Sequence, residues 1–573
     1  MIKVSRRKLL VASTALSLAA CGKVSAPEDF KATTGSTNEA FAHGVASGDM
    51  TQSSAIIWTR VSGKTSDSGV ILSWELSETE NFAPTVRSGA VIAYAAADYT
   101  AKVDVKDLLP GKTYYFRFKS GKEISSVGRL KTLPEGRLDT LRFAVVSCTN
   151  WEAGFFNVYD HIARDESFDA VLHLGDYFYE YGEGGWGGDA GQSIGRSHVP
   201  KHELITLSDY RARHAQYRTD PNLQAMTAMH ALLPMWDDHE TANDSWKDGA
   251  QNHNADEGSW NSRKKSALQA YYEWMPVRNP KGKAENLYKS YSFGDLLTLV
   301  TIETRLSARA QPINIDDYTK DMDGKEDAEI FRKEVLYAPD RPMMDEAQTE
   351  FIIDAFSNSK AAEQPWRLMG NQVVMGRLHS ADLTPHVKEE NILAIEADWP
   401  AVRDFVKNSA YGLPIYPDSW DGYPWAREQL YTKLRAAGLT DIVVVTGDAH
   451  EFWANDLTDD AGTKIGVELG TTSVTSPTLF SYFGKDTPDY SMLVTQSNPD
   501  VRYYNAMHNG YVDLTFTRSK AEVKLITVDT VLDRSYSAGA VAEFTVKKSG
   551  KSVKFTSPKG LTMLQRALFA GIG

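Results

Sequence analysis

The chain of 573 residues carries 62 Lys and Arg against 75 Asp and Glu, a formal net charge of −13. This length predicts two or more domains, and an apolar content of 42% is enough for large cores. The acidic balance argues against nucleic acid as a structural partner, because phosphate backbones are bound by an excess of Lys and Arg.

The N-terminus has the features of an export signal. Arg6 and Arg7 precede a mildly apolar stretch over 9–20 that is too short to span a bilayer, a pattern that resembles the twin-arginine signal. The stretch runs into the letters LAAC, which resemble a bacterial lipobox and end at Cys21. We therefore predict a signal peptide over 1–20, export by the twin-arginine machinery, and a lipid anchor on Cys21. This anchor would make the protein a periplasmic or cell-surface lipoprotein of a bacterium, unless the signal is a plain secretory one with an incidental Cys.

The two cysteines of the chain are expected to have different roles. Residues 21–40, rich in Ser, Thr and Ala, are expected to form a flexible tether that begins at Cys21. If Cys21 carries lipid, Cys148 has no disulfide partner in an oxidising compartment. Cys148 is then either buried and inert or used as a ligand, and its place at a strand end favours the second.

Residues 41–134 are expected to form an all-β domain. Short alternating segments at sandwich spacing predict strands over 55–60, 70–77, 86–94, 100–108, 114–119 and 125–132. The stretch LLPGKTYYFR at 108–117 resembles the tyrosine-corner region of fibronectin type III domains. The region has no cluster of metal-ligand residues, so we expect it to have a packing or covering role.

The catalytic domain is expected over 138–573, C-terminal strands included. It opens with LRFAVV at 141–146, a continuous apolar run that is typical of a strand covered on both faces. The run ends close to Cys148 and Asn150. A helix is expected to follow, with apolar residues recurring at helical spacing over 155–162.

The next predicted strand, 171–174, runs into a Gly-Asp turn. This turn places Asp176 at the end of the strand, and Tyr179 follows three residues later. In a strand–helix–strand unit the two strands run parallel and their ends lie side by side. Asp176 and Cys148 are therefore expected to meet at the carboxyl edge of the sheet, where α/β proteins place their ligands.

Three further apolar strands end in residues of the same kinds. After a Gly-rich loop over 182–195, which is long enough to be a mobile lid, and a charged helix over 209–220, the strand at 231–236 runs into DDHETAND. The later strands at 367–370 and 441–445 end in NQ and TGDAH. The candidate site residues at these three ends are Asp238, His239, Asn371, Gln372, Asp448 and His450.

The order of these motifs resembles the calcineurin-like metallophosphoesterases, and more closely the PhoD-type alkaline phosphatases and their phosphodiesterase relatives. The likeness covers nearly the whole mature chain and includes HGVASGD at 43–49, SWDGY at 419–423 and NGY at 509–511. It implies an α/β metallophosphatase core of two stacked β-sheets flanked by helices, behind an N-terminal fibronectin III-like β-sandwich. It also implies a site that holds one ferric ion with calcium or another divalent ion.

The resemblance implies four ligands for the Fe³⁺ ion, and their chemistry suits ferric iron. Cys148, Asp176, Tyr179 and His450 stand at the matching positions, and a phenolate is a hard anionic donor that stabilises ferric iron. Asp176 would bridge to the second metal.

The second metal site departs from the general family pattern. Asp238 and Asp448 supply carboxylates where related enzymes have nitrogen ligands, which favours Ca²⁺, or alternatively Mn²⁺ or Mg²⁺. Asn371 and Gln372 stand where the family supplies a histidine, so the number of ligands at this site is left open.

The resemblance implies an exported hydrolase that uses a metal-activated hydroxide to release phosphate from phosphate monoesters. His239 would protonate the leaving group or contact the phosphate, and Asn150, Asn371 and Gln372 would orient the phosphate. One alternative is a phosphodiesterase that acts on phospholipid, teichoic-acid-like or nucleotide diesters. A non-enzymatic surface lipoprotein with an adhesion domain is a further alternative, against which the five convergent strand ends argue.

Overall fold

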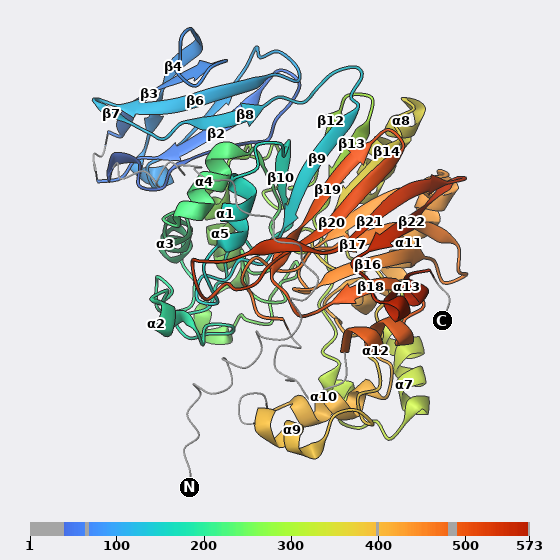
Figure 1. Cartoon of the computed structure of the whole chain (residues 1–573). Coiled ribbons are helices and arrows are strands. Elements are labelled where there is room, and N and C mark those ends of the chain that lie inside the picture. The colour runs from blue at the N-terminus through green and yellow to red at the C-terminus, as the bar shows by residue number, and fades with distance from the viewer. Residues whose placement is uncertain (1–38, 64–67, 397–399, 479–489, 571–573) are drawn as a thin grey trace.

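The computed structural model of the protein describes residues 39–63, 68–396, 400–478 and 490–570. The predicted signal peptide, Cys21 and nearly all of the tether lie outside these ranges. Two large β-sheets occupy the centre of the molecule, and a smaller sheet lies at the end where the blue N-terminal strands gather (Figure 1).

The first large sheet has ten strands in the order β22-β21-β20-β19-β9-β10-β11-β1-β2-β5. Strands β9, β10, β11 and β1 run parallel, and the others pair antiparallel. In chain order the strands are β1 (Val45–Gly48), β2 (Ala55–Arg60), β5 (Thr100–Val105), β9 (Thr140–Val146), β10 (Ala170–His173), β11 (Leu232–Pro234), β19 (Gly510–Thr517), β20 (Lys520–Val528), β21 (Ala538–Ser549) and β22 (Ser552–Lys559).

The second large sheet has seven strands in the order β12-β13-β14-β15-β17-β16-β18. Its central strands β13, β14, β15 and β17 are parallel. The strands are β12 (Lys289–Phe293), β13 (Leu297–Thr301), β14 (Trp366–Gly370), β15 (Ile442–Thr446), β16 (Phe452–Thr458), β17 (Lys464–Gly470) and β18 (Val501–Asn505).

The two sheets pack face to face, and helices cover their outer faces. Along β9, Phe143 and Val145 point into the core between the sheets, whereas Ala144 and Val146 pack against the helical side. The apolar run of this strand is continuous because both of its faces are buried. The predicted core of two stacked sheets flanked by helices is thus confirmed.

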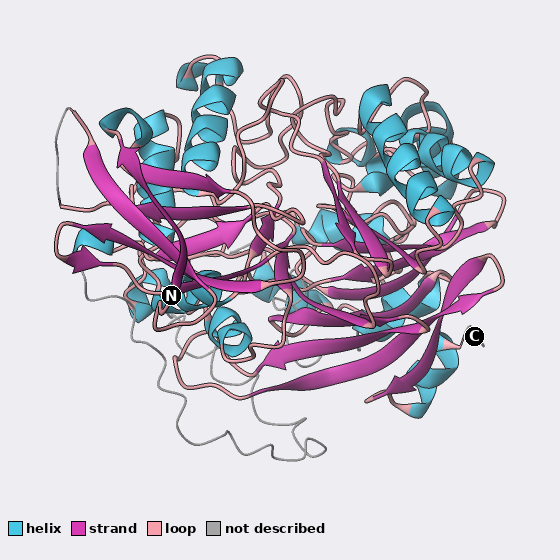
Figure 2. Ribbon diagram, turned by 90° about the horizontal axis from the view of Figure 1, so that it is seen from above, coloured by secondary structure: helices cyan, strands magenta, loops and turns pink. Residues whose placement is uncertain are grey.

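Helices lie around the outside of the strands (Figure 2). Helices α1 (Asn157–Ala163), α3 (Leu207–Tyr217), α4 (Pro221–Met229) and α5 (Trp260–Trp274) cover the first sheet. Helices α8 (Glu346–Ala361) and α11 (Pro424–Ala436) cover the second. The remaining helices are α2 (Gly191–Ile194), α6 (Asp316–Thr319), α7 (Lys325–Phe331), α9 (Glu389–Ile395), α10 (Val402–Ser409), α12 (Tyr490–Ser497) and α13 (Met563–Phe569). In the described ranges, none of the helices has both the length and the apolar composition of a membrane span.

The N-terminal region forms the predicted β-sandwich. Its outer sheet contains β3 (Val70–Ser77), β4 (Thr85–Ala93), β6 (Thr113–Ser120), β7 (Glu123–Ile124) and β8 (Gly128–Lys131). The hydroxyl of Tyr114 accepts a hydrogen bond of 3.0 Å from the Leu109 N–H, the contact expected of a tyrosine corner. The inner strands of the sandwich, β1, β2 and β5, belong to the ten-stranded sheet, because β1 pairs with β11. The sandwich therefore shares a sheet with the core.

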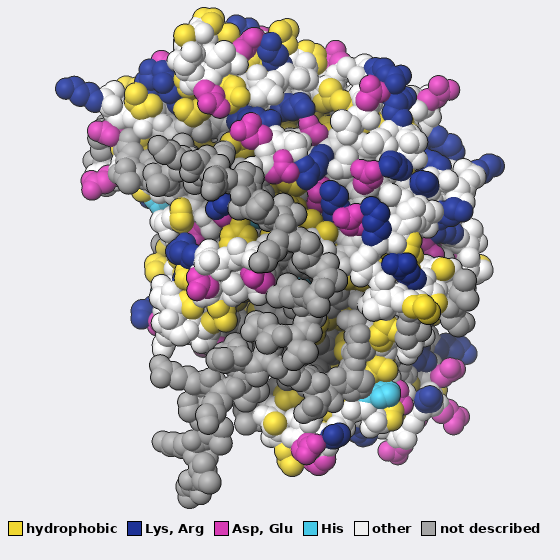
Figure 3. Space-filling view, in the orientation of Figure 1, with side chains coloured by type: hydrophobic (Ala, Val, Ile, Leu, Met, Phe, Trp, Pro, Cys, Tyr) yellow, Lys and Arg dark blue, Asp and Glu magenta, His cyan; other side chains and the backbone are white. Residues whose placement is uncertain are grey.

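The described part of the surface in Figure 3 carries both kinds of charge. Acidic and basic side chains are intermixed over this face rather than sorted into separate patches.

Candidate metal centre

The parallel strands of the two sheets end at a common place. Ser147, just after β9, forms an isolated parallel bridge with Ser473, just after β17. A Cβ atom on Gly447 would lie 2.5 Å from the Ser147 hydroxyl, and one on Gly175 would lie 2.4 Å from the Asp237 Cβ. Gly447 therefore allows the strand ends of the two sheets to approach closely, and Gly175 allows the ends of the neighbouring strands β10 and β11 to do so within the first sheet.

The backbone at this meeting point is strained. Among the non-glycine residues with left-handed φ values are four at these strand ends: Cys148 (61°), Asp176 (53°), Asp448 (65°) and His450 (59°). Each such residue costs about 1–3 kcal/mol, and they tend to gather at functional sites, where the surrounding structure fixes them. All four were predicted metal ligands.

The first group of candidate ligands contains Cys148, Asp176 and His450, whose ligand atoms lie within 4.8 Å of one another. Tyr179 completes it: its hydroxyl donates to Asp176 Oδ2 at 3.1 Å and lies 3.0 Å from His450 Nε2. Burial, and then the charge of Asp176, raise the pKa of the Cys148 thiol and of the Tyr179 phenol well above their usual values. A bound cation would reverse this and favour the thiolate and the phenolate.

The second group contains Asp176, Asp237, Asp238 and Asp448, also within 4.8 Å of one another. Asp176 belongs to both groups, as expected of a bridging ligand. The Asp176 Oδ1 and Asp237 Oδ2 atoms are buried and have no hydrogen-bond partner in the described part of the chain. Buried carboxylates are costly unless they are paired or coordinate a metal, so the residues present fit a bound cation.

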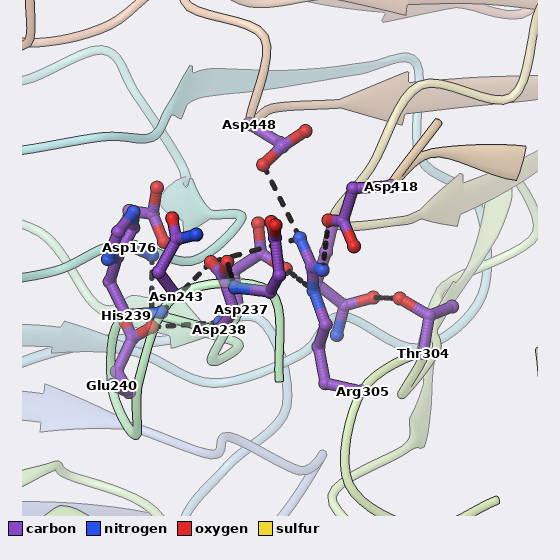
Figure 4. Close-up of polar contacts among 12 residues, drawn as sticks. Asp176, Asp237, Asp238, His239, Glu240, Asn243, Thr304, Arg305, Asp418 and Asp448 are labelled. Carbon is purple, nitrogen blue, oxygen red and sulfur yellow. Dashed lines mark hydrogen bonds and ion pairs between the residues drawn. The ribbon is translucent and has the colours of Figure 1, made fainter. Parts of the chain in front are cut away.

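Arg305 balances much of the negative charge of this group (Figure 4). Its side chain is fully buried and donates to Asp237 and Asp418. A third contact of 3.4 Å joins its Nη2 to Asp448 Oδ1, and Asp238 Oδ1 lies 3.8 Å from the same nitrogen. The guanidinium therefore holds four carboxylates that would otherwise repel one another.

The ionisation of these carboxylates differs with their surroundings. Burial works to raise the pKa of Asp238, but Arg305 and His239 outweigh burial and lower it. Burial raises the pKa of Asp237 to about 6, with Arg305 opposing the shift. Burial, and then Asp418, raise the pKa of Asp244 to about 8. Asp238, Asp244 and Asp418 form a further group with oxygen atoms within 4.8 Å of one another.

The predicted acid, His239, is held by a buried carboxylate. Its Nδ1 lies 2.7 Å from Glu180 Oε2, while Glu180 Oε1 accepts hydrogen bonds of 2.8 Å from the Asn243 N–H and the Asn252 side chain. Burial alone would lower the pKa of His239, but Asp238, Asp176 and Glu180 raise it well above its usual value. Glu180 thus fixes the orientation of the ring and favours its protonated form.

We predict that Glu180→Gln and His239→Ala lower kcat on an alkyl phosphate by about 100-fold, because an unactivated alkoxide must be protonated as it leaves. The loss on nitrophenyl phosphate should be smaller, since nitrophenolate leaves without a proton. With Glu180→Gln the pKa of His239 falls, so the alkaline limb of the rate profile should move to lower pH. Steady-state rates on both substrates, measured across a range of pH, give the losses in kcat and the position of the alkaline limb.

The matched control is Glu183→Gln, which removes a carboxylate of the same loop that pairs with Lys201 at 2.8 Å. This variant should behave like the wild type. Equal losses on the two substrates in His239→Ala would assign the ring to phosphate contact rather than to proton donation.

The three predicted amides have structural partners. Asn150 donates to the Trp186 carbonyl at 3.0 Å and accepts from the Glu152 N–H at 3.0 Å. Gln372 donates to two backbone carbonyls and accepts from Thr304. Asn371 donates to the Val373 carbonyl at 2.8 Å. Gln372 has no spare N–H for a phosphate, so its predicted substrate contact gains no support from this geometry.

Several residues of the centre were not predicted. Arg305 follows β13, a sixth strand that runs into polar residues (Glu303-Thr304-Arg305), and this repetition was the signal that could have revealed it. Glu180 directly follows Tyr179 and carried no separate signal. Asp237 opens the DDHETAND motif and Asp418 directly precedes SWDGY, but their role as partners of Arg305 depends on contacts across the fold.

The fold and the two groups of candidate metal ligands define the class of the protein as a metallophosphatase. The model of the PhoD-like phosphatase family matches residues 143–525, and that of the PhoD-like N-terminal domain matches residues 25–134. The chain therefore belongs to the PhoD-like phosphatase family, and it is an alkaline-phosphatase-type phosphoric ester hydrolase, as predicted.

Two known proteins extend the comparison. Alkaline phosphatase D of Bacillus subtilis (strain 168) is 31% identical over 533 residues, which cover 90% of this chain and 82% of the relative. A solved structure of PhoD superposes with a TM-score of 0.75 at 28% identity and covers 94% of this chain and 97% of that one. Both similarities extend over the sandwich and the core.

Proposed function

We propose that the protein releases phosphate from phosphate monoesters with a ferric ion and a calcium ion. The observation that supports bound cations is the pair of buried carboxylate oxygens on Asp176 and Asp237 that have no partner in the described part of the chain. Cys148, Asp176, Tyr179 and His450 would hold Fe³⁺, a donor set with thiolate, phenolate and carboxylate charges. The second group, which is all carboxylate, would hold Ca²⁺, a cation that prefers oxygen ligands.

The protein residues then have distinct tasks in hydrolysis. When bound, the two cations would polarise the phosphoryl oxygens and lower the pKa of a water. His239 would donate a proton to the leaving alkoxide, and Glu180 would keep the ring in place. Asp448, whose side chain is 20% exposed against 3% for Asp238, lies on the solvent side of the group.

The test is metal analysis of the purified protein, followed by rates on a monoester and a diester. We expect one iron, bound calcium, and faster release of phosphate from nitrophenyl phosphate than cleavage of bis-nitrophenyl phosphate. A protein that cleaves only the diester would be a phosphodiesterase, and one that cleaves neither with both metals bound would contradict the proposal.

We predict that the purified protein absorbs visible light, because a phenolate bound to ferric iron gives a charge-transfer band. Tyr179→Phe should abolish or shift this band, and Tyr181→Phe, a change on the neighbouring ring, should leave it in place. An active wild-type protein that is colourless and free of iron would rule the ferric assignment out.

The proposal includes export by the twin-arginine route and a lipid anchor on Cys21, a residue outside the described ranges. Twin-arginine export moves folded proteins, which suits an enzyme that binds its metals before transport. We predict that Cys21→Ser abolishes incorporation of labelled lipid and releases the protein from the membrane fraction, while phosphatase activity is retained. Unchanged lipid labelling of the variant would refute the anchor.

A further inference from the structure

The Gly-rich loop over 182–195 carries one large aromatic side chain, Trp186, to the edge of the metal centre. The indole ring lies 5.8 Å from the Tyr179 ring at an interplanar angle of 27° and 5.3 Å from the His450 ring at 34°. Trp186 therefore stacks on Tyr179 and lies tilted against His450, two candidate iron ligands, yet 41% of its surface is exposed. Among the tryptophans that the structure describes, it alone belongs to the exposed large apolar residues.

A second ring extends this surface. Tyr181 stacks on Tyr179 at 6.4 Å and 26° and meets the edge of His239 at 5.4 Å and 62°. His239 is the residue that faces the leaving group in the proposed reaction. Trp186 and Tyr181, here called the aromatic rim, both stack on Tyr179, and Tyr181 reaches the side of the centre where the leaving group departs.

The loop holds Trp186 in a fixed position. Glu152 accepts hydrogen bonds of 2.9 Å from the N–H groups of Gly184 and His198, and Asn150 donates to the Trp186 carbonyl at 3.0 Å. Gly187 has a φ of +73°, and a Cβ there would lie 3.0 Å from the Asn150 amide nitrogen. These contacts anchor the predicted lid, so little conformational entropy would be lost when a ligand stacks on the indole.

We propose that Trp186 is a specificity-determining residue that stacks on an aromatic ring of the leaving group. Part of the indole covers the ligand rings, and the exposed remainder offers an apolar surface beside an otherwise acidic centre. Offset stacking suits a planar ring and not a puckered aliphatic one of the same size. The preferred substrates would be phosphate monoesters whose alcohol carries an aromatic ring, such as aryl or nucleoside phosphates. This inference rests on the proposed monoesterase function.

The test compares benzyl phosphate with cyclohexylmethyl phosphate, whose leaving alcohols are similar in size and acidity. We expect wild-type kcat/KM to favour the benzyl ester by about two- to tenfold, the range of an aromatic pair. Trp186→Leu should remove this preference, chiefly by raising KM for the benzyl ester, and Trp186→Phe should keep part of it. The same comparison of kcat/KM between a nucleoside monophosphate and ribose 5-phosphate tests stacking on a nucleobase.

The control is Tyr94→Leu, which removes a 50% exposed aromatic ring from the sandwich and should keep the wild-type preference. Iron content and the visible band show whether each variant retains its metal. An equal loss on both esters in Trp186→Leu would make the indole a cover for the iron ligands and overturn the proposal, as would a wild-type protein without preference. Failure of wild-type protein to hydrolyse either ester would instead contradict the monoesterase function.

Discussion

Asp448→Ala and Asp238→Ala should each lower the rate of phosphate release by about 1,000-fold or more, because opening a two-metal clamp removes several kcal/mol of transition-state stabilisation. Both carboxylates belong to the second group and neither to the first, so calcium should be lost while iron stays bound. The measurements are kcat on nitrophenyl phosphate and the metal content of each variant.

The two positions should differ in how far added calcium restores activity. Asp448 is partly exposed and Asp238 is buried, so millimolar calcium should rescue Asp448→Ala better than Asp238→Ala. The matched control is Asp460→Ala, which removes a 43% exposed aspartate that pairs with Arg377. Near-normal activity in both variants of the second group would mean that these carboxylates serve only the fold.

Arg305→Met should destabilise the protein by about 3–5 kcal/mol, the usual cost of removing one partner from a buried ion pair. The substitution leaves Asp237, Asp418 and Asp448 without their shared counter-charge. Calcium in the second group would replace part of that charge, so the loss should be largest in the presence of a calcium chelator. Thermal unfolding with and without calcium measures the effect, and Arg305→Lys should keep part of the stability.

The loss should also depend on pH. Burial raises the pKa of Asp237 to about 6 although Arg305 opposes the shift, so removing Arg305 raises this pKa further. The native state then binds the proton more tightly than the unfolded chain does, and stability falls as the pH rises through this range. The difference in the free energy of unfolding between Arg305→Met and the wild type should therefore be smaller below pH 6 than at pH 8. An effect independent of both calcium and pH would show that Arg305 contributes packing alone.

The strand ends could be predicted because local sequence specifies them. The apolar runs that lead to Cys148, Asp176 and Asp448 are bounded by small or polar residues, and parallel strands necessarily bring their ends together. Strands β2 and β3 coincide with their predicted ranges. The tyrosine corner was recognisable because its hydrogen bond joins residues only five positions apart.

The charge partners of the centre could not be predicted in this way. Arg305 meets Asp418 across 113 positions of sequence, and His239 meets Glu180 across 59. No local pattern marks such pairs, because they depend on how the two sheets are brought face to face. The continuation of the sandwich into the ten-stranded sheet was missed for the same reason, since the pairing of β1 with β11 links distant segments.

The most direct test of the two-metal account is the rate of phosphate release before and after treatment with a calcium-selective chelator, with iron and calcium measured in the same samples. The account predicts that activity falls with the calcium content while iron and its visible band remain, and that added calcium restores the rate. Full activity after calcium is removed, with iron unchanged, would contradict it.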